Sequence, residues 1–219
     1  MAITISGTTG VAGVDGSASA PSVVGSDSNS GVYFGADTIK FSTGGTERLE
    51  ITNSGVSGGG KILQVVNGIQ TAAVSRTTSS GDWGSIMNSP AYSVTRSGTK
   101  SLVLVTAYVS TSNDTGRYGL RLYRWSSTDA YETLTYGDAA SSRTPANMAS
   151  NQQSTVQFLP ASFVYLDTHG KAAGTNIQYN LYTSGETSDT IYLNRTDADT
   201  DTASVYRTTS TITVMEVDA

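Results

Sequence analysis

From residue 61 onward, apolar and polar residues alternate over short stretches, which is the pattern of β-strands with one buried face. In Tyr118–Trp125 the alternation separates Arg121, Tyr123 and Trp125 from the leucines between them, so the two sets are expected on opposite faces. The chain ends in the same way at Ser210–Val217, whose Thr, Ile and Val residues suit a pleated, half-buried surface. We expect this last strand to lie deep in a sheet, with the other strands packed around it.

Two segments depart from simple alternation. Leu102–Val105 is apolar at four consecutive positions, as expected of a strand that is covered on both faces. Pro160 interrupts the apolar stretch 156–166, and a proline there indicates an edge strand, a bulge or two separate strands. No stretch shows convincing helical periodicity. Residues 61–219 are therefore predicted to form about eight strands in an antiparallel β-sandwich or jelly roll.

One segment of this second part is long and polar for a loop. Ser126–Ser154 contains Tyr131 and Tyr136 among Ser, Thr, Asp, Ala and Asn, and a short strand at Glu132–Tyr136 is an alternative interpretation. Long loops in compact domains are usually functional or mobile. Tyrosine offers a large, stiff, amphipathic contact area, and burial in a core is least required in such a loop. Tyr131 and Tyr136 are therefore the candidate residues for contact with a ligand.

Residues 1–60 have a different composition and hold 13 of the 23 glycines. Apolar residues come in small groups separated by turn signals such as Gly44-Gly45, which predicts short strands and tight turns without helix. So few large apolar side chains cannot offset the entropy of ordering 60 residues in isolation. The segment is either disordered or buries its apolar residues against identical copies. The dense β-formers of Gly31–Thr52 favour the second alternative.

The stretch Ser54–Gly60, reading SGVSGGG, has the composition of a flexible hinge. It places a domain boundary between residues 1–60 and residues 61–219. The predicted fold class is therefore all-β, with a short-stranded, Gly-rich first segment followed by an antiparallel, jelly-roll-like β-sandwich.

Charge and composition narrow the range of expected binding partners. The chain has 18 acidic against 13 basic residues and a pI of about 4.7, which argues against binding nucleic acid by neutralising phosphates. No cysteine is present, so disulfides and thiolate metal sites are excluded. No run approaches the roughly 18 apolar residues of a membrane span, and the N-terminus does not resemble a secretory signal. We expect a protein made in the cytoplasm, without membrane insertion.

Motifs for catalysis are weak. Residues 55–59 match the G-x-S-x-G pattern of hydrolases, but that pattern requires a following helix, which is not predicted here. The single histidine, His169, lies in a turn and is expected to be exposed. Carboxylates fall mostly in predicted turns and loops. We therefore assign no catalytic residue, no cofactor and no enzymatic activity.

A calcium site stays an open alternative. Asp197, Asp199 and Asp201 have the spacing of the first ligands of a calcium loop. An EF-hand loop would also require Gly where Thr202 stands and Glu where Thr208 stands. A non-EF calcium site and a solvated acidic turn both fit the sequence, so no metal ligand is assigned.

The chain resembles the fibre proteins of bacteriophages, especially of marine phages that infect cyanobacteria. The resemblance to their C-terminal head domain is carried by five stretches: KILQVV at 61–66, LVLV at 102–105, FVYLD at 163–167, IYLNR at 191–195 and the closing strand at 210–217. The stretch 31–51, with IKF at 39–41 and GTERLEI at 45–51, is similar to a shaft segment of the same proteins. These motifs are structural, so they transfer no site residues.

The resemblance implies a homotrimer on a virion, with residues 1–60 as a Gly-rich trimeric attachment and shaft segment and residues 61–219 as a β-sandwich head domain. The N-terminal segment would join other virion proteins of the tail or capsid, and the head would contact a glycan or protein of the host surface. Cyclic symmetry would also supply the partners that a segment without its own core requires. The alternatives are a capsid decoration or head-fibre protein without receptor binding, and a glycan depolymerase.

Overall fold

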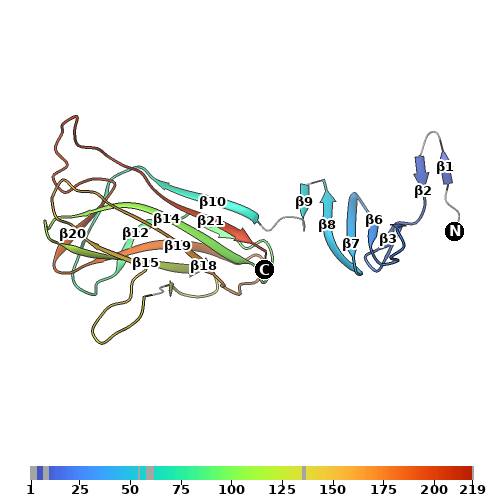
Figure 1. Ribbon diagram of the computed structural model, residues 1–219, viewed down its shortest axis with the longest axis horizontal. Helices are drawn as coiled ribbons and strands as arrows, with labels where there is room; N and C mark the ends of the chain where they lie inside the picture. Colours follow the sequence, from blue (N-terminus) through green and yellow to red (C-terminus); the bar gives the residue numbers. More distant parts are fainter. Residues whose placement is uncertain (1–3, 7–9, 54, 58–61, 135–136, 219) are drawn as a thin grey trace. The chain divides into compact units, whose positions relative to one another are not determined.

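The computed structural model describes the chain except residues 1–3, 7–9, 54, 58–61, 135–136 and 219 (Figure 1). The described residues form antiparallel β-strands joined by turns and contain no helix, which confirms the all-β prediction. They accordingly include no helix that could cross a membrane. The chain divides into two compact units, residues 1–61 and residues 62–219.

The first unit consists of short antiparallel strands. Two hairpins come first and a five-stranded sheet follows, with its strands in sequence order. The strands are β1 (Thr4–Ser6), β2 (Gly10–Ala12), β3 (Gly16–Ser17), β4 (Ala20–Pro21), β5 (Val23–Val24), β6 (Gly31–Gly35), β7 (Thr38–Thr43), β8 (Thr46–Thr52) and β9 (Gly55–Ser57). Gly44 and Gly45 join β7 to β8 with positive φ angles of 59° and 74°, the backbone of the tight turn that glycine pairs favour.

The five-stranded sheet has one apolar and one polar face. The strand register places apolar residues side by side in two rows, Phe34–Ile39–Ile51–Val56 and Val23–Val32–Phe41–Leu49. On the other face, Lys40 pairs with Glu47 at 3.2 Å and with Glu50 at 2.9 Å, and the Tyr33 hydroxyl donates to Glu47. Tyr33 is the one buried hydrophobic residue among the described residues of this unit. Among the residues of this unit that the structure describes, no second layer covers the apolar face.

The second unit is built from two antiparallel sheets. The first, called here the β14 sheet, contains β10 (Ile62–Gln70), β21 (Ser210–Val217), β14 (Lys100–Thr111), β18 (Leu159–Asp167), β20 (Asp189–Leu193) and β11 (Val74–Thr78). The second, the β15 sheet, contains β12 (Gly84–Asn88), β13 (Tyr92–Ser93), β19 (Asn176–Gly185), β15 (Arg117–Ser126), β16 (Glu132–Leu134) and β17 (Met148–Asn151). From β13 onward the chain passes repeatedly from one sheet to the other, an alternation found in double-sheet jelly rolls.

One hydrophobic core joins the two sheets. Alternate residues of every long strand are buried in it, including Val103 and Val105 of β14, Leu120 and Leu122 of β15, and Tyr179 of β19. The unit is thus a β-sandwich, as the alternation in the sequence predicted. The closing strand β21 lies between β10 and β14, which confirms its expected central position (Figure 1).

The departures from alternation have structural explanations. β18 pairs with β14 alone, so Pro160 lies on an edge strand, one of the three predicted alternatives. The alternative strand at 132–136 is present as β16, over Glu132–Leu134. Leu102–Val105 was expected to be covered on both faces, and here the prediction is wrong for the single chain: Val103 and Val105 are buried, whereas Leu102 and Leu104 are only half-buried on the outer face.

A buried carboxylate holds one end of the sandwich. Glu216 of β21 is fully buried and accepts hydrogen bonds from the Thr95 amide at 2.9 Å, the Thr99 hydroxyl at 2.7 Å and the Gln64 amide. Burial raises the pKa of Glu216, but the hydrogen bonds from Gln64, Thr95 and Thr99 outweigh it and lower the pKa below the usual 4.5. The charged form therefore ties β10 and the loop after β13 to the closing strand.

Because the folded state lowers the pKa of Glu216, its contribution to stability is present above the unfolded pKa and is lost as the pH falls through the folded one. We expect Glu216→Gln to lower the unfolding free energy at pH 7 by about 2 kcal/mol. The difference between variant and wild type should shrink as the pH is lowered from about 5 to about 3. Thermal unfolding at constant protein concentration measures both. Glu186→Gln, at an exposed ion pair, is the control and should track the wild type; a Glu216→Gln difference that does not change with pH would contradict the assignment.

Candidate functional site

The outer face of the β15 sheet carries a cluster of aromatic rings. Tyr123 of β15 and Tyr182 of β19 stack with ring centroids 4.1 Å apart and ring planes inclined by 30°. Tyr131, from the loop that follows β15, approaches Tyr182 with a centroid distance of 6.1 Å. Burial and the neighbouring Tyr131 and Tyr123 raise the pKa of Tyr182, so its hydroxyl stays neutral. Tyr131 is 54% exposed.

A tryptophan and an arginine extend this cluster along the same face. Arg121 lies directly opposite Tyr182 in the strand register, and its guanidinium carbon is 4.0 Å from the centre of the Trp83 ring. The Arg121 Nε donates to the Pro145 carbonyl at 2.7 Å, which fixes the guanidinium plane. Trp83 also crosses Gly119: a β-carbon at that position would be 2.7 Å from the edge of the indole ring. The absence of a side chain at Gly119 therefore lets the indole lie close to the sheet.

Beside Trp83 lies a shallow hollow of about 190 Å³. Its walls combine the indole with hydroxyl and charged groups, among them Ser80, Thr144, Arg117 and Glu186. Arg117 and Glu186 pair with each other at 3.1 Å and are both exposed. We call Trp83, Arg121, Tyr123, Tyr131 and Tyr182 the aromatic surface, with the hollow at its Trp83 end.

The chemistry of the aromatic surface is that of a binding site. Aromatic rings that keep one face or edge in water stack on flat apolar surfaces, such as the face of a sugar ring, and their hydroxyl or N–H groups bind polar substituents. The residues are also held rigidly by strands and ring contacts, which lowers the entropy lost on binding. The surface therefore fits a polar ligand with an exposed ring or an aromatic-containing peptide.

The structure describes one of the two tyrosines that the sequence indicated as candidates for ligand contact. The structure places Tyr131 in the aromatic surface, exposed and next to Tyr182. Tyr136 lies outside the described residues. The sequence did not single out Arg121, Tyr123 or Tyr182 as contact residues. The alternation of residues 118–125 put Arg121 and Tyr123 on one face of a strand, but it did not show which strands are neighbours.

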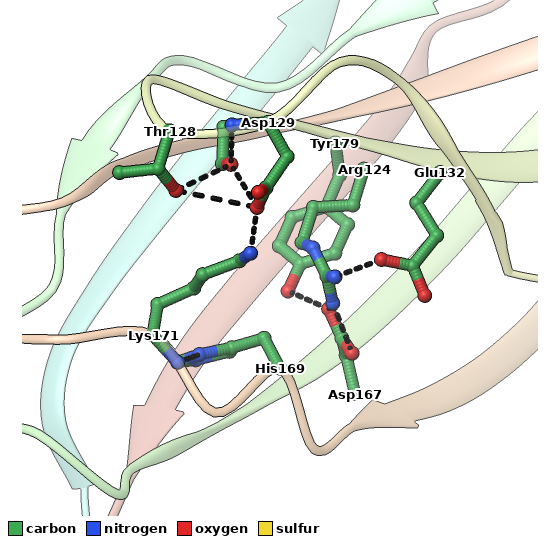
Figure 2. A network of polar contacts seen from close by, with 9 residues as sticks. Arg124, Thr128, Asp129, Glu132, Asp167, His169, Lys171 and Tyr179 are labelled. Carbon is green, nitrogen blue, oxygen red and sulfur yellow. Dashed lines mark hydrogen bonds and ion pairs between the residues drawn. The ribbon is translucent and has the colours of Figure 1, made fainter.

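Charged residues form a second cluster around the end of β18 and the loop that follows it (Figure 2). Arg124 is buried, and one of its terminal nitrogens donates to both carboxylate oxygens of Asp167 at 2.7 Å. The Tyr179 hydroxyl donates to the same carboxylate at 2.8 Å, and the other Arg124 nitrogen pairs with Glu132. Asp167 is thus fully satisfied by groups of the protein, as a structural ion pair requires.

The same region corrects the expectation for His169. It was expected to be exposed, but only 8% of its surface is exposed. Its Nδ1 accepts from the Lys171 amide at 3.0 Å, which folds the chain back after β18, and burial lowers its pKa so that the neutral form is favoured. Lys171 in turn pairs with Asp129 near the surface (Figure 2). Among the described residues the His169 Nε2 has no hydrogen-bond partner, and its Nδ1 is held by the backbone of its own loop, which is the geometry of a structural anchor.

The three aspartates of the candidate calcium loop do not converge. Asp199 accepts from Arg195 at 3.1 Å and from the Arg207 Nε at 3.0 Å, and the hydrogen bond from Arg207 is the main cause that lowers its pKa. Across the described parts of the chain, no group of three or more acidic or histidine side chains has metal-binding geometry. Asp199 acts instead as an acceptor that holds the loop before β21.

Comparisons with known proteins add little to this geometry. No protein-family model matches the chain, and no curated protein matches it. Among solved structures, the chain is similar to the Eiger TNF of S. frugiperda, with 15% sequence identity and a TM-score of 0.30. That match covers 70% of this chain and 92% of the other. A similarity this remote does not transfer a function from one protein to the other.

Because Arg124 is buried, removing the charge of its main partner should be costly. We expect Asp167→Asn to lower the unfolding free energy by about 3 kcal/mol, since the guanidinium would be left with the exposed Glu132 alone. Asp129→Asn removes the partner of Lys171 at the surface and should change it by less than about 1 kcal/mol. Urea unfolding at one protein concentration measures both. Equal effects of the two substitutions would show that the Arg124 pair is not the anchor.

Proposed function

We propose that this chain is a trimeric virion fibre protein that binds a host surface through its C-terminal head. The observation that carries the proposal is the five-stranded sheet of the first unit, which is apolar on one face and has no layer to cover that face. Phe34, Ile39 and Phe41 are 37–41% exposed there, and Val56 is 66% exposed. The resemblance of the shaft and head segments to phage fibre proteins supports the virion location and the number of copies.

The energetics favour self-association of this unit. Eight apolar side chains lie in two adjacent rows, and each would gain about 25 cal/mol per Å² of surface removed from water. The opposite face keeps its charges paired by Lys40, Glu47 and Glu50, so only one face requires a partner. Identical copies supply three such faces, which can close around a common axis. The N-terminal unit thereby serves as shaft and as attachment to other virion proteins.

The head supplies the binding function. Its aromatic surface offers stacking faces, an arginine plane and a hollow with hydroxyl groups, a combination suited to a host glycan or a protein loop. Three heads on one shaft would strengthen weak single contacts by raising the effective concentration. Binding without chemistry fits the charged cluster as well, because the Asp167 carboxylate is occupied by Arg124 and Tyr179.

Light scattering of the full-length chain tests the assembly. We expect a mass of three times the 22.8 kDa chain mass. Ile39→Asp, in the middle of the apolar rows, should shift the mass toward that of one chain, because burying an unpaired carboxylate in the interface costs several kcal/mol. Ala36→Asp, at an exposed position of the β6–β7 turn, should leave the mass unchanged. A wild-type mass of one chain would overturn the proposal.

Binding by labelled protein to an array of bacterial surface polysaccharides, and to intact host cells, tests the aromatic surface. Removal of a central binding residue typically costs more than 1 kcal/mol, so Tyr182→Ala and Tyr131→Ala should each weaken binding by roughly tenfold. The matched control is Tyr206→Ala, because Tyr206 is 69% exposed and is not part of the aromatic surface. If the wild-type trimer binds neither polysaccharide nor cells, receptor binding is wrong and capsid decoration becomes the better account.

A further inference from the structure

The outer face of the β14 sheet is aliphatic. The register of β10, β21, β14 and β18 places the residues of this face in rows that cross four strands. The rows are Val65–Met215–Leu102–Leu166 and Asn67–Thr213–Leu104–Val164, followed by Ile69–Thr211–Thr106–Ser162. Ile62 and Val217 extend the face at one end. We call these residues the aliphatic face.

The apolar side chains of this face are unusually exposed to water for a protein that acts as a single chain. Ile62, Val65, Ile69 and Val164 are 53–59% exposed, and they lie on both flanks of the half-buried Leu102 and Leu104. Among the outward residues of these four strands, Lys100 at the start of β14 is the single charged one. Contiguous apolar patches of this kind mark interaction surfaces, in contrast to isolated exposed leucines or valines.

The opposite outer face provides an internal comparison. On the β15 sheet, the outward positions hold Arg117, Arg121, Tyr182 and Gln178, and the hollow beside Trp83 opens there. Both outer faces belong to one sandwich and both face away from the same core. The fold alone therefore does not explain why the two faces differ in composition. The outer face of the β15 sheet is suited to water and a polar ligand, and that of the β14 sheet is suited to an apolar layer.

We propose that the aliphatic face is covered by a second copy of this chain, so that the heads associate with one another as well as the shafts. The proposal rests on the proposed trimer, because association of the first units holds copies of the head at high local concentration next to each other. An identical copy is the partner that is always present at that concentration. The sequence points the same way: Leu102–Val105 is apolar at four successive positions, which suits a strand covered on both faces, and the single chain covers one.

One polar pair of this face is satisfied within the face and does not oppose burial. The Thr213 hydroxyl donates to the side-chain oxygen of Asn67 at 3.0 Å within the face. A polar pair that satisfies itself can lose water at low cost, whereas an unpaired hydroxyl or amide cannot. The rows are otherwise built of short, β-branched or aliphatic side chains, which pack closely against a neighbouring surface. A binding partner of opposite charge has nothing to recognise here, since Lys100 is the single charge.

The consequence for function is orientation. The two outer faces of a sandwich face in opposite directions, so a head that packs its β14 sheet against its neighbours turns its β15 sheet away from them. Every aromatic surface in the assembly would then be accessible from outside, and none would be lost in the contacts between heads. The placement of the aliphatic face thus accounts for why the candidate ligand-binding residues gather on the other sheet.

Single cysteines in the full-length chain test this, because the chain has none of its own. Val164→Cys places a thiol on the aliphatic face, and Ser85→Cys places one at an exposed strand position of the β15 sheet. In the assembled protein we expect a bulky polyethylene-glycol maleimide to label Val164→Cys at least about tenfold more slowly than Ser85→Cys, since the first thiol reacts only when heads separate. In urea the two rates should become equal.

The outcomes separate this inference from the proposed function. If light scattering shows the trimer mass and both thiols label at the same rate, the heads do not associate and this inference is wrong, while the trimeric shaft stands. If the mass is that of one chain, both proposals fail.

A second pair of variants gives an independent reading. Val164→Lys should lower the melting temperature of the assembled protein and speed hydrogen exchange of β14 and β21, whereas Ser85→Lys should change neither. If the heads do not associate, both lysines point into water. Equal and negligible changes in melting temperature and hydrogen exchange would therefore also overturn the inference.

Discussion

A β-sheet with one apolar face must have that face covered, and this constraint decides how the chain is organised. In the head the constraint is met internally, because two sheets bury their inner faces against each other around Val103, Leu120, Tyr179 and their neighbours. In the described part of the first unit, by contrast, no second layer covers the two apolar rows. The proposed trimer would cover these rows with the same rows of identical copies.

Inside the head, polar groups are placed where they fix the sandwich without disturbing its core. Glu216 joins the closing strand to the loop at 95–99 through neutral donors, and Asp167 joins β18 to β15 and β19 through Arg124 and Tyr179. Both carboxylates are buried and both have their partners, which is the condition under which burial of a charge is tolerated. They hold elements that are far apart in the sequence, and neither carboxylate belongs to the aromatic surface.

The sequence predicted the class of the fold and the positions of many strands along the chain, because alternation is a local signal that any half-buried strand must carry. Residues 118–125 lie in a strand with the two faces that their alternation predicted. The candidate site was only partly predicted. Tyr131 could be singled out since it sits in a polar loop, but the stacking of Tyr123 on Tyr182 depends on which strands pair, and pairing is non-local. His169 was placed wrongly for a related reason: a turn sequence does not reveal that tertiary packing covers it.

The register between Ile62 and Val217 has a further implication. The first residue of β10 and the last residue of β21 are paired, so the polypeptide enters and leaves the head at one corner. All the loops that surround the aromatic surface are therefore internal connections, tethered at both ends by strands. A circular permutant could join this corner with a short linker and open the chain in a distant loop. It would preserve every strand pairing of the sandwich, so the second unit could be attached to another support through the new termini.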